Sequence, residues 1–250
     1  DARDRDAAKN KNEEFTGISI YTAQSNDNGA NFDINQKFHE HVCECCRMPT
    51  VWTTDGPVAF WRNIFGKNTR DFVISNLDKG GVRRVTNDEW QIDGCPHHGG
   101  DIALGAEERL HLVWFTLGKT RQGLFYKHLQ GMRESSPISI GDSAAQASHP
   151  SIAASGKKVL ITWREFDGNN ITANSMFSND GGITWSEQQQ LADSNGSADY
   201  PVPLINNSQQ MQVVWNTETE GLRILEVNND PGLQASISRW YTDLKNRLLN

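Results

Sequence analysis

Short apolar runs that contain a tryptophan recur along the chain about every fifty residues. They lie at 58–61, 111–115, 159–163 and 211–215, and their tryptophans, Trp61, Trp114, Trp163 and Trp215, are separated by 53, 49 and 52 residues. The eight Trp, ten Phe and 21 Gly of the chain favour short strands and many turns over long helices. The pattern therefore predicts a repeated all-β unit.

Each of these runs has strand-like neighbours at fixed places in the repeat. A second apolar run follows it, at 71–75, 123–129, 171–177 and 222–227, and residues 18–24 are a fifth copy. Another short run precedes it, at 49–52, 100–104, 150–154 and 201–205. Four short strands per unit predict the blades of a β-propeller, and the uneven strand count predicts five or six four-stranded blades.

A turn motif of the form Ser-x-Asp-x-Gly-x-x-aromatic follows two of these runs. It occurs at 25–32 and 178–185, with a looser copy at 75–81. The motif resembles the Asp-box, or bacterial neuraminidase repeat, of sialidase-like β-propellers, and the resemblance covers nearly the whole chain. We expect its carboxylate and hydroxyl groups to accept backbone N–H bonds inside a hairpin turn, a structural role that we favour over the alternative of a calcium or sugar site. The residues concerned are Ser25, Asp27, Gly29, Asp78, Gly80, Ser178, Asp180 and Gly182.

Three segments are predicted from these patterns. Residues 1–16 are a polar N-terminal segment, residues 17–230 form the propeller, and residues 231–250 form a short amphipathic helix. The helix prediction rests on one apolar face. We expect the helix to pack on the propeller or to dock to a protein partner. The residues of this face are Ile237, Trp240, Tyr241, Leu244 and Leu248.

Charge and hydropathy exclude some classes of function. The formal net charge of −7 argues against nucleic-acid binding, which needs an excess of Lys and Arg. No apolar run approaches the ~20 residues of a membrane span. The polar start has no signal-peptide core, so none existed or it has been removed. Asp-box proteins are mostly secreted or periplasmic, so the resemblance implies an exported protein.

Two cysteine motifs stand out, HVCECCRMP at 41–49 and DGCPHHGG at 93–100. Both precede the first strand of a unit, as do residues 147–150 and 198–201 in the later units. In a propeller these connections lie on one face, around the mouth of the central channel. We therefore expect the following residues to converge there: Cys43, Cys45, Cys46, Arg47, Cys95, His97, His98, His149, Asp199 and Tyr200.

Thiolate and imidazole groups are the usual ligands of copper and zinc. We do not interpret C-x-C-C or C-P-H-H as the C-x₂-C spacing of a zinc finger, so the metal hypothesis depends on the convergence of the two motifs. We expect Cys45, Cys46 and Cys95 to be thiolate ligands, completed by one of two adjacent histidines. That histidine is His97 or His98, and Cys43 or His149 is a substitute ligand. This hypothesis gives the protein a metal-handling or accessory-subunit role.

A disulfide is the alternative, because four cysteines form an even set in an exported protein. A bridge from Cys95 to Cys43, Cys45 or Cys46 would join two adjacent blades and give a disulfide-stapled protein-interaction module. One bridge together with a residual metal site is a third arrangement.

Basic residues are also expected near the channel mouth. They would form a funnel for an anionic ligand or, equally, be solvated loop charges. The residues are Arg47, Arg62, Lys67, Arg70, Lys119, Arg121 and Arg164.

Glycoside hydrolysis is a further alternative. Arg47-Met48-Pro49 resembles the Arg-Ile-Pro motif of sialidases, in which the Arg helps bind the substrate carboxylate. An exo-glycosidase of this kind would use Arg47, Glu165, Asp199 and Tyr200. The arginine triad, the activating Glu and the acid/base Asp of sialidases have no matching positions in this sequence. The two cysteine motifs are also similar to those of bacterial sialidase-like proteins that carry C-x-C-C-R and C-P-H-x-G in this order, which supports pairing the motifs.

Overall fold

The computed structural model describes residues 3–13 and 17–228. Apart from helix α1 (Arg3–Lys11) and a short 3-10 turn η1 (Ala106–Glu108), these residues form strands and loops. None of the described helices has the length and apolar character needed to cross a membrane. The predicted C-terminal helix lies outside the described residues, and α1 lies in the N-terminal segment for which only polarity was predicted.

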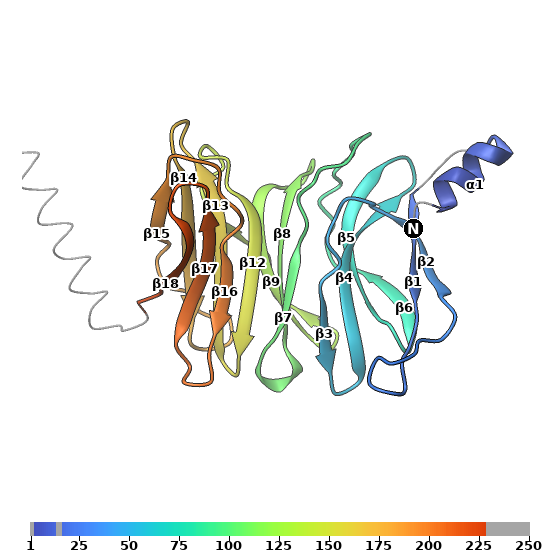
Figure 1. The fold of residues 1–250 in the computed structure, drawn as a ribbon, viewed down its shortest axis with the longest axis horizontal. Helices are drawn as coiled ribbons and strands as arrows, with labels where there is room; N and C mark the ends of the chain where they lie inside the picture. Colours follow the sequence, from blue (N-terminus) through green and yellow to red (C-terminus); the bar gives the residue numbers. More distant parts are fainter. Residues whose placement is uncertain (1–2, 14–16, 229–250) are drawn as a thin grey trace, which may run out of the picture.

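Four antiparallel sheets follow one another along the chain and lie side by side (Figure 1). The first contains β3 (Thr50–Thr53), β4 (Gly56–Phe65), β5 (Thr69–Asn76) and β6 (Gly80–Arg84). The second contains β7 (Asp101–Leu104), β8 (Leu110–Leu117), β9 (Gln122–Gln130), β10 (Arg133–Glu134) and β11 (Ile138–Ile140). The third contains β12 (Ser148–Ser155), β13 (Lys158–Phe166), β14 (Ile171–Ser178) and β15 (Gln189–Ser194), and the fourth contains β16 (Val202–Ile205), β17 (Met211–Thr217) and β18 (Gly221–Glu226).

A hairpin of β1 (Ile18–Thr22) and β2 (Gln36–Val42) joins the first sheet through the pairing of Val42 with Asn63. It holds the third and fourth strands of a unit, as expected of a chain that starts inside a blade. The hairpin and the fourth sheet lie at opposite ends of the row (Figure 1). The described part of the chain thus supplies four sheets and the hairpin of a further unit.

The four repeated tryptophans occupy equivalent positions, as the sequence predicts. Trp61, Trp114, Trp163 and Trp215 lie on β4, β8, β13 and β17, the second strand of each sheet, and each is no more than 1% exposed. Apolar clusters fill the spaces between neighbouring sheets. One example is the cluster of Phe60, Phe72, Leu112 and Trp114 between the first two sheets. Burial of these side chains against the next sheet accounts for the repeat of the Trp-containing runs.

The two faces of the propeller carry different turns. On one face, the turn after β3 contacts the turn after β5, since Asn76 Nδ2 donates to Asp55 O at 2.8 Å. On the other, the β4–β5 loop contacts the long connection from β6 to β7, with Ile92 N donating to Asn68 O at 3.1 Å. The connections that bear the cysteine motifs therefore lie on the face opposite the Asp-box turns, as the topology predicts.

The two close copies of the Asp-box have the expected geometry. Ser25 Oγ accepts from Gly29 N at 2.8 Å, and Ser178 Oγ accepts from Gly182 N at 2.9 Å. The looser copy differs, because the side chain of Asn76 accepts from the backbone N–H groups of Asp78 and Lys79. Asn76 therefore organises that turn in place of the predicted Asp78.

A candidate metal centre where the connections meet

The first cysteine motif folds into a tight turn at the end of β2. Cys43 N donates to Arg62 O at 3.0 Å, which continues the pairing between β2 and β4. Cys46 N then donates to Cys43 O at 3.5 Å, which closes a turn over Glu44 and Cys45. The backbone thus gathers three cysteines within four residues of chain.

The three sulfur atoms of this turn lie together. Cys46 Sγ lies 3.4 Å and Cys45 Sγ 3.8 Å from Cys43 Sγ, and all three Sγ atoms are within 4.8 Å of one another. Cys43 is only 1% exposed, while Cys45 and Cys46 are half-buried. All four cysteines are free thiols, so the structure holds none of the predicted disulfides. Three sulfur donors at these separations can converge on one metal ion.

Cys43 is the most acidic of the three. The hydrogen bond from Cys46 and the nearby Arg70 and Arg62 outweigh burial and lower the pKa of Cys43 to about 5. Arg70 Nη1 lies 3.1 Å from Cys43 Sγ. Burial raises the pKa of Cys45 to about 12, and donation to Cys43 together with burial raises the pKa of Cys46. The turn therefore holds one thiolate at neutral pH in the absence of a ligand.

Arg62 is buried beneath this turn, with 0% of its surface exposed. Its Nη2 donates to His98 O at 2.9 Å and to Phe115 O at 2.8 Å. Its guanidinium also lies over the rings of Phe72 and Trp90, at 4.3 and 4.7 Å from their centres. Burial lowers the pKa of Arg62. Arg62 is therefore an internal link between the first two sheets, which corrects both the predicted anion funnel and the alternative of a solvated loop charge for this residue.

The second cysteine motif lies against the first. Cys46 Sγ lies 3.9 Å from His98 O, and Cys95 Sγ lies 3.8 Å from Glu44 Oε1. Cys95 also interacts with the Cys45 thiol, although it is not among the three sulfurs within 4.8 Å of one another. Sequence reasoning expected Cys95 as a ligand and Cys43 only as a substitute, whereas the structure gathers Cys43, Cys45 and Cys46. The C-x₂-C spacing of Cys43 and Cys46 was the overlooked signal.

Glycine permits the close approach of the second motif. A side chain at Gly100 would overlap the rings of Phe60 and Phe72, and its Cβ would lie 2.8 Å from Val113 O. A Cβ at Gly99 would lie 3.3 Å from Arg47 N. The two glycines that follow His98 thus let the connection enter β7 directly over the first sheet.

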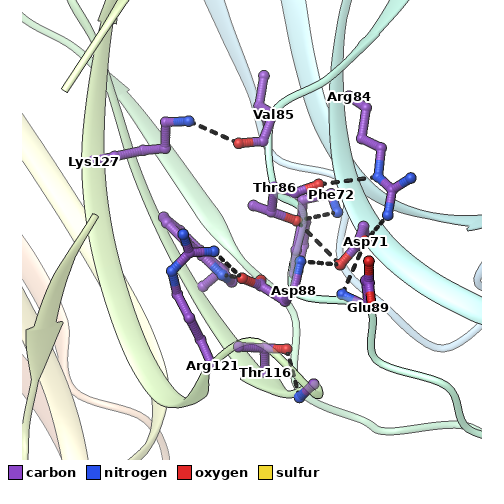
Figure 2. Close-up of polar contacts among 12 residues, drawn as sticks. Asp71, Phe72, Arg84, Val85, Thr86, Asp88, Glu89, Thr116, Arg121 and Lys127 are labelled. Atoms are coloured by element: carbon purple, nitrogen blue, oxygen red, sulfur yellow. Dashed lines mark hydrogen bonds and ion pairs between the residues drawn. The ribbon is translucent and has the colours of Figure 1, made fainter. Parts of the chain in front are cut away.

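Two buried carboxylates fix the start of this connection (Figure 2). Asp71 forms an ion pair with Arg84 and accepts from Asp88 N at 3.0 Å and Glu89 N at 3.3 Å. Asp88 in turn accepts from Arg121 Nη1 at 2.8 Å. It also accepts from Trp114 Nε1 at 2.8 Å. Burial raises the pKa of Asp88. Sequence reasoning missed both residues; the signal for Asp71 was a charged residue at the start of an otherwise apolar run, DFVIS.

A row of rings continues from the cysteine turn across the other connections. His98 stacks on Phe115 at 4.3 Å between ring centres, His149 lies 4.5 Å from His98, and Tyr200 stacks on His149 at 3.9 Å. Burial, reinforced by nearby positive charge, lowers the pKa of His98 to about 4 and of His149 to about 3. Both imidazoles are therefore neutral at physiological pH. Residues from the entry of the second, third and fourth sheets thus lie along one line, with His149 as the second residue of β12, and His97 is exposed beside it.

Arg47 and Arg164 lie by the far end of this row. Their guanidinium carbons are 5.9 and 5.6 Å from the centre of the Tyr200 ring. Arg47 also lies 3.5 Å from Pro150 O, and Arg164 donates to Ala198 O at 3.2 Å. The other predicted funnel residues are placed differently: Arg70 is buried against Cys43, Arg121 is ion-paired with Asp88, and Lys67 and Lys119 are exposed.

The carboxylates proposed for glycoside hydrolysis have structural contacts. Glu165 Oε1 accepts from Trp163 Nε1 and from Asp142 N, both at 2.8 Å. Asp199 Oδ2 accepts from Asn216 Nδ2 at 2.9 Å. In the described structure, the recorded contacts of Tyr200 are with His149, Arg47 and Arg164, and none is with a carboxylate base.

Known structures share this architecture at low sequence identity. A lectin from Burkholderia pseudomallei superposes with a TM-score of 0.50 and 10% identity, covering 83% of this chain and 62% of the lectin. A sialidase from Trypanosoma rangeli gives a TM-score of 0.47 and 10% identity, covering 84% of this chain and 38% of the sialidase. An α-L-arabinanase from Penicillium chrysogenum gives 0.47 and 12% identity, covering 87% and 68%.

The chain thus spans less than two thirds of the length of the lectin and the sialidase. No family model and no curated protein sequence matches it. The sheet order, the buried tryptophans and the similarity to the lectin together support a β-propeller fold.

Proposed function

We propose that this propeller binds a soft transition-metal ion, copper(I) or zinc, at the turn that contains Cys43, Cys45 and Cys46. The observation that carries the proposal is the mutual approach of their three Sγ atoms to within 4.8 Å. Thiolates favour copper(I), for which three sulfurs form a complete trigonal set, and also bind zinc.

The buried positive charges beside the turn support the proposal. Within residues 17–228, Arg62 and Arg70 form no ion pair with a carboxylate, although both are buried. A buried charge is costly unless an opposite charge lies nearby. Three thiolates around one copper(I) ion carry two net negative charges, which these two arginines would neutralise.

Zinc would need a different ligand set. Structural zinc sites have four ligands, and Cys95 is the nearest further thiol because it interacts with Cys45. Four thiolates around Zn²⁺ also carry two net negative charges. The charge of the two arginines therefore fits copper(I) with three cysteines and zinc with four, and Cys95 distinguishes the two ions.

The test is a competition titration of the fully reduced protein with copper(I) and with zinc, using chromophoric chelators of known affinity. We expect one ion per chain, and Cys43→Ser and Cys46→Ser should each weaken binding of both ions at least about 100-fold. Cys95→Ser should weaken zinc binding and leave copper(I) binding within about threefold. Met48→Leu, a half-exposed thioether beside the turn, is the control and should change neither affinity. Equal binding by the wild type and Cys43→Ser would refute the metal site.

The biological role that fits such a site is metal handling, or an accessory function, by an exported protein. Export rests on the resemblance of the Asp-box turns to those of secreted and periplasmic proteins. Cell fractionation with antibodies against the chain tests it, and recovery of the protein only with cytoplasmic markers would refute it.

One observation favours exo-glycosidase activity as a second candidate. The guanidinium groups of Arg47 and Arg164 both lie within 6 Å of the ring of Tyr200, a placement that suits an acidic sugar. Turnover of an aryl sialoside or related aryl glycoside, abolished by Arg47→Ala or Tyr200→Phe, would support it. No turnover over a panel of such substrates would exclude it and leave metal binding as the function.

A further inference from the structure

The last sheet of the row has one face with exposed apolar side chains that no described residue covers, and Gln212, Asn216 and Glu226 lie on the same face. Val202 of β16 pairs with Val214 of β17, which pairs with Ile224 of β18, so these three side chains lie in a row on one face. Leu204 and Leu222 extend the same face. Leu222 and Ile224 are 71% and 65% exposed, and Val202 and Leu204 are nearly half exposed.

The other face of this sheet is covered. Met211 and Val213 of β17 are buried against Leu160 and Phe177 of the third sheet. The second and third sheets are each covered on both faces by apolar clusters. The exposed face of the fourth sheet is therefore the one on which the next layer of a propeller would pack, and its side chains have the apolar character of that position.

The segment that follows β18 along the chain has a matching sequence. Residues 231–250 lie outside the described structure, and their sequence predicts a helix with a single apolar face. From Ile237 to Leu248 such a helix is about 17 Å long, and strands of four to seven residues, as in this sheet, are about 13 to 23 Å long. The nine residue steps from Asn228 to Ile237 can reach about 30 Å, more than enough to return across three strands.

The charges of the two segments are also complementary. Residues 211–228 contain Glu218, Glu220 and Glu226 against one arginine, Arg223. The C-terminal residues contain three basic side chains against the single acid Asp243; they are Arg239, Lys245 and Arg247. A docked helix would therefore place basic groups near Glu226 of β18 and near the acidic turn between β17 and β18.

We infer that residues 231–250 bind the exposed face of the fourth sheet as an amphipathic helix, with Trp240 and Leu244 against Val214 and Ile224. The C-terminal segment would then cover the exposed face of the fourth sheet and keep that face from contacting another molecule. The inference is independent of the metal proposal, since it concerns the opposite end of the row from the cysteine turn.

Hydrogen exchange of the β18 peptide tests the inference. We expect amides at 221–226 to exchange about tenfold faster in Trp240→Ser/Leu244→Ser than in the wild type, while amides of β8 keep their rates. Asn246→Ser, on the polar side of the predicted helix, is the matched control and should leave β18 unchanged. A chain that ends at residue 230 should behave like the double variant. It should also associate into dimers or larger species, because the apolar side chains of the fourth sheet are then exposed.

Two results would overturn the inference. One is equal exchange at 221–226 in the wild type and the double variant. The other is a wild-type protein that sediments as a dimer and loses both the dimer and the protection of β18 on Ile224→Lys or on dilution, since a second copy would then be the occupant. Circular dichroism of the double variant establishes that the propeller remains folded, so a rate change confined to β18 reports docking.

Discussion

Replacing Arg62 with Met tests whether this buried guanidinium joins the first two sheets beneath the cysteine turn. Methionine keeps an unbranched apolar chain of similar length but removes the charge and the hydrogen-bond donors. The carbonyl oxygens of His98 and Phe115, which accept from Arg62 Nη2 at 2.9 and 2.8 Å, would lose this partner in a buried environment. The same change would remove the cation that lies over Phe72 and Trp90.

The expected loss follows from these contacts. Each short hydrogen bond from a charged donor contributes about 1.5 to 3 kcal/mol, so two contribute about 3 to 6 kcal/mol. Removing a fully buried charge recovers part of its desolvation cost. We therefore expect the free energy of unfolding to fall by about 3 kcal/mol. Arg164→Met is the matched control, because Arg164 follows a buried tryptophan in the same way but is half-exposed with one bond of 3.2 Å to Ala198 O. Arg164→Met should lower the free energy of unfolding by no more than about 1 kcal/mol.

Urea unfolding of both variants, monitored by tryptophan fluorescence, provides the measurement. The midpoint should fall for Arg62→Met with an unchanged dependence on urea, which would show that stability and not compactness has changed. A loss below about 1 kcal/mol, or equal losses for the two variants, would refute the assignment of Arg62 as an internal link. In either case other groups would have to donate hydrogen bonds to the carbonyl oxygens that Arg62 now satisfies.

Three other changes test separate parts of the fold. Gly100→Ala should destabilise the protein by about 2 kcal/mol in urea unfolding, because the new methyl group overlaps Phe60 and Phe72, whereas Gly94→Ala should be nearly neutral, since only Ile92 approaches its Cβ, at 4.0 Å. Asp88→Asn should lower the free energy of unfolding by about 2 kcal/mol, because it breaks the buried ion pair with Arg121. Asp93→Asn, in the same connection, should change the free energy of unfolding little. Equal effects of the two substitutions would contradict the placement of Asp88. Although burial opposes it, hydrogen bonds from Thr184 and Ser178 lower the pKa of Asp180 from 3.8 to about 2, so its stabilisation is full above pH 4 and is lost as the pH falls from about 4 to about 2. Asp180→Ala should therefore lower stability at neutral pH and flatten this acid limb without changing metal affinity, and an unchanged acid limb would contradict it.

The periodic tryptophans explain why the fold could be predicted. A repeat of about fifty residues is visible because each unit buries the same kind of side chain against its neighbour, as Trp114 and Trp163 do. The number of blades could not be predicted in the same way, since β1 and β2 have the pattern of half a unit whether or not the rest of that unit is present. Helix α1 was missed because its sequence, RDRDAAKNK, has no apolar face for periodicity to detect.

The candidate site was predictable in position but not in detail. Propeller topology places the connection that ends at Arg47 beside the one that ends at Gly99, and the structure brings them into contact. The burial of Arg62 was not predictable, because a lone arginine in a strand has the same pattern whether it faces solvent or the next sheet. The contribution of Cys43 could have been predicted from its C-x₂-C spacing with Cys46, because the turn closed by Cys46 N and Cys43 O brings the two thiols together.

Arg62 also explains why a ligand at the cysteine turn would act on more than one sheet. The turn is attached to β4 through Cys43 N and Arg62 O, and the same arginine donates to His98 O in the connection before β7 and to Phe115 O of the second sheet. A metal ion that binds only the folded arrangement stabilises it by an amount that grows with its concentration, about 2.7 kcal/mol at 100 times the dissociation constant. Because Arg62 links both sheets to the turn, metal binding would stabilise the contact between the two sheets as well as the four residues of the turn. A metal ion bound at this junction would therefore also stabilise the packing of the propeller's first two sheets.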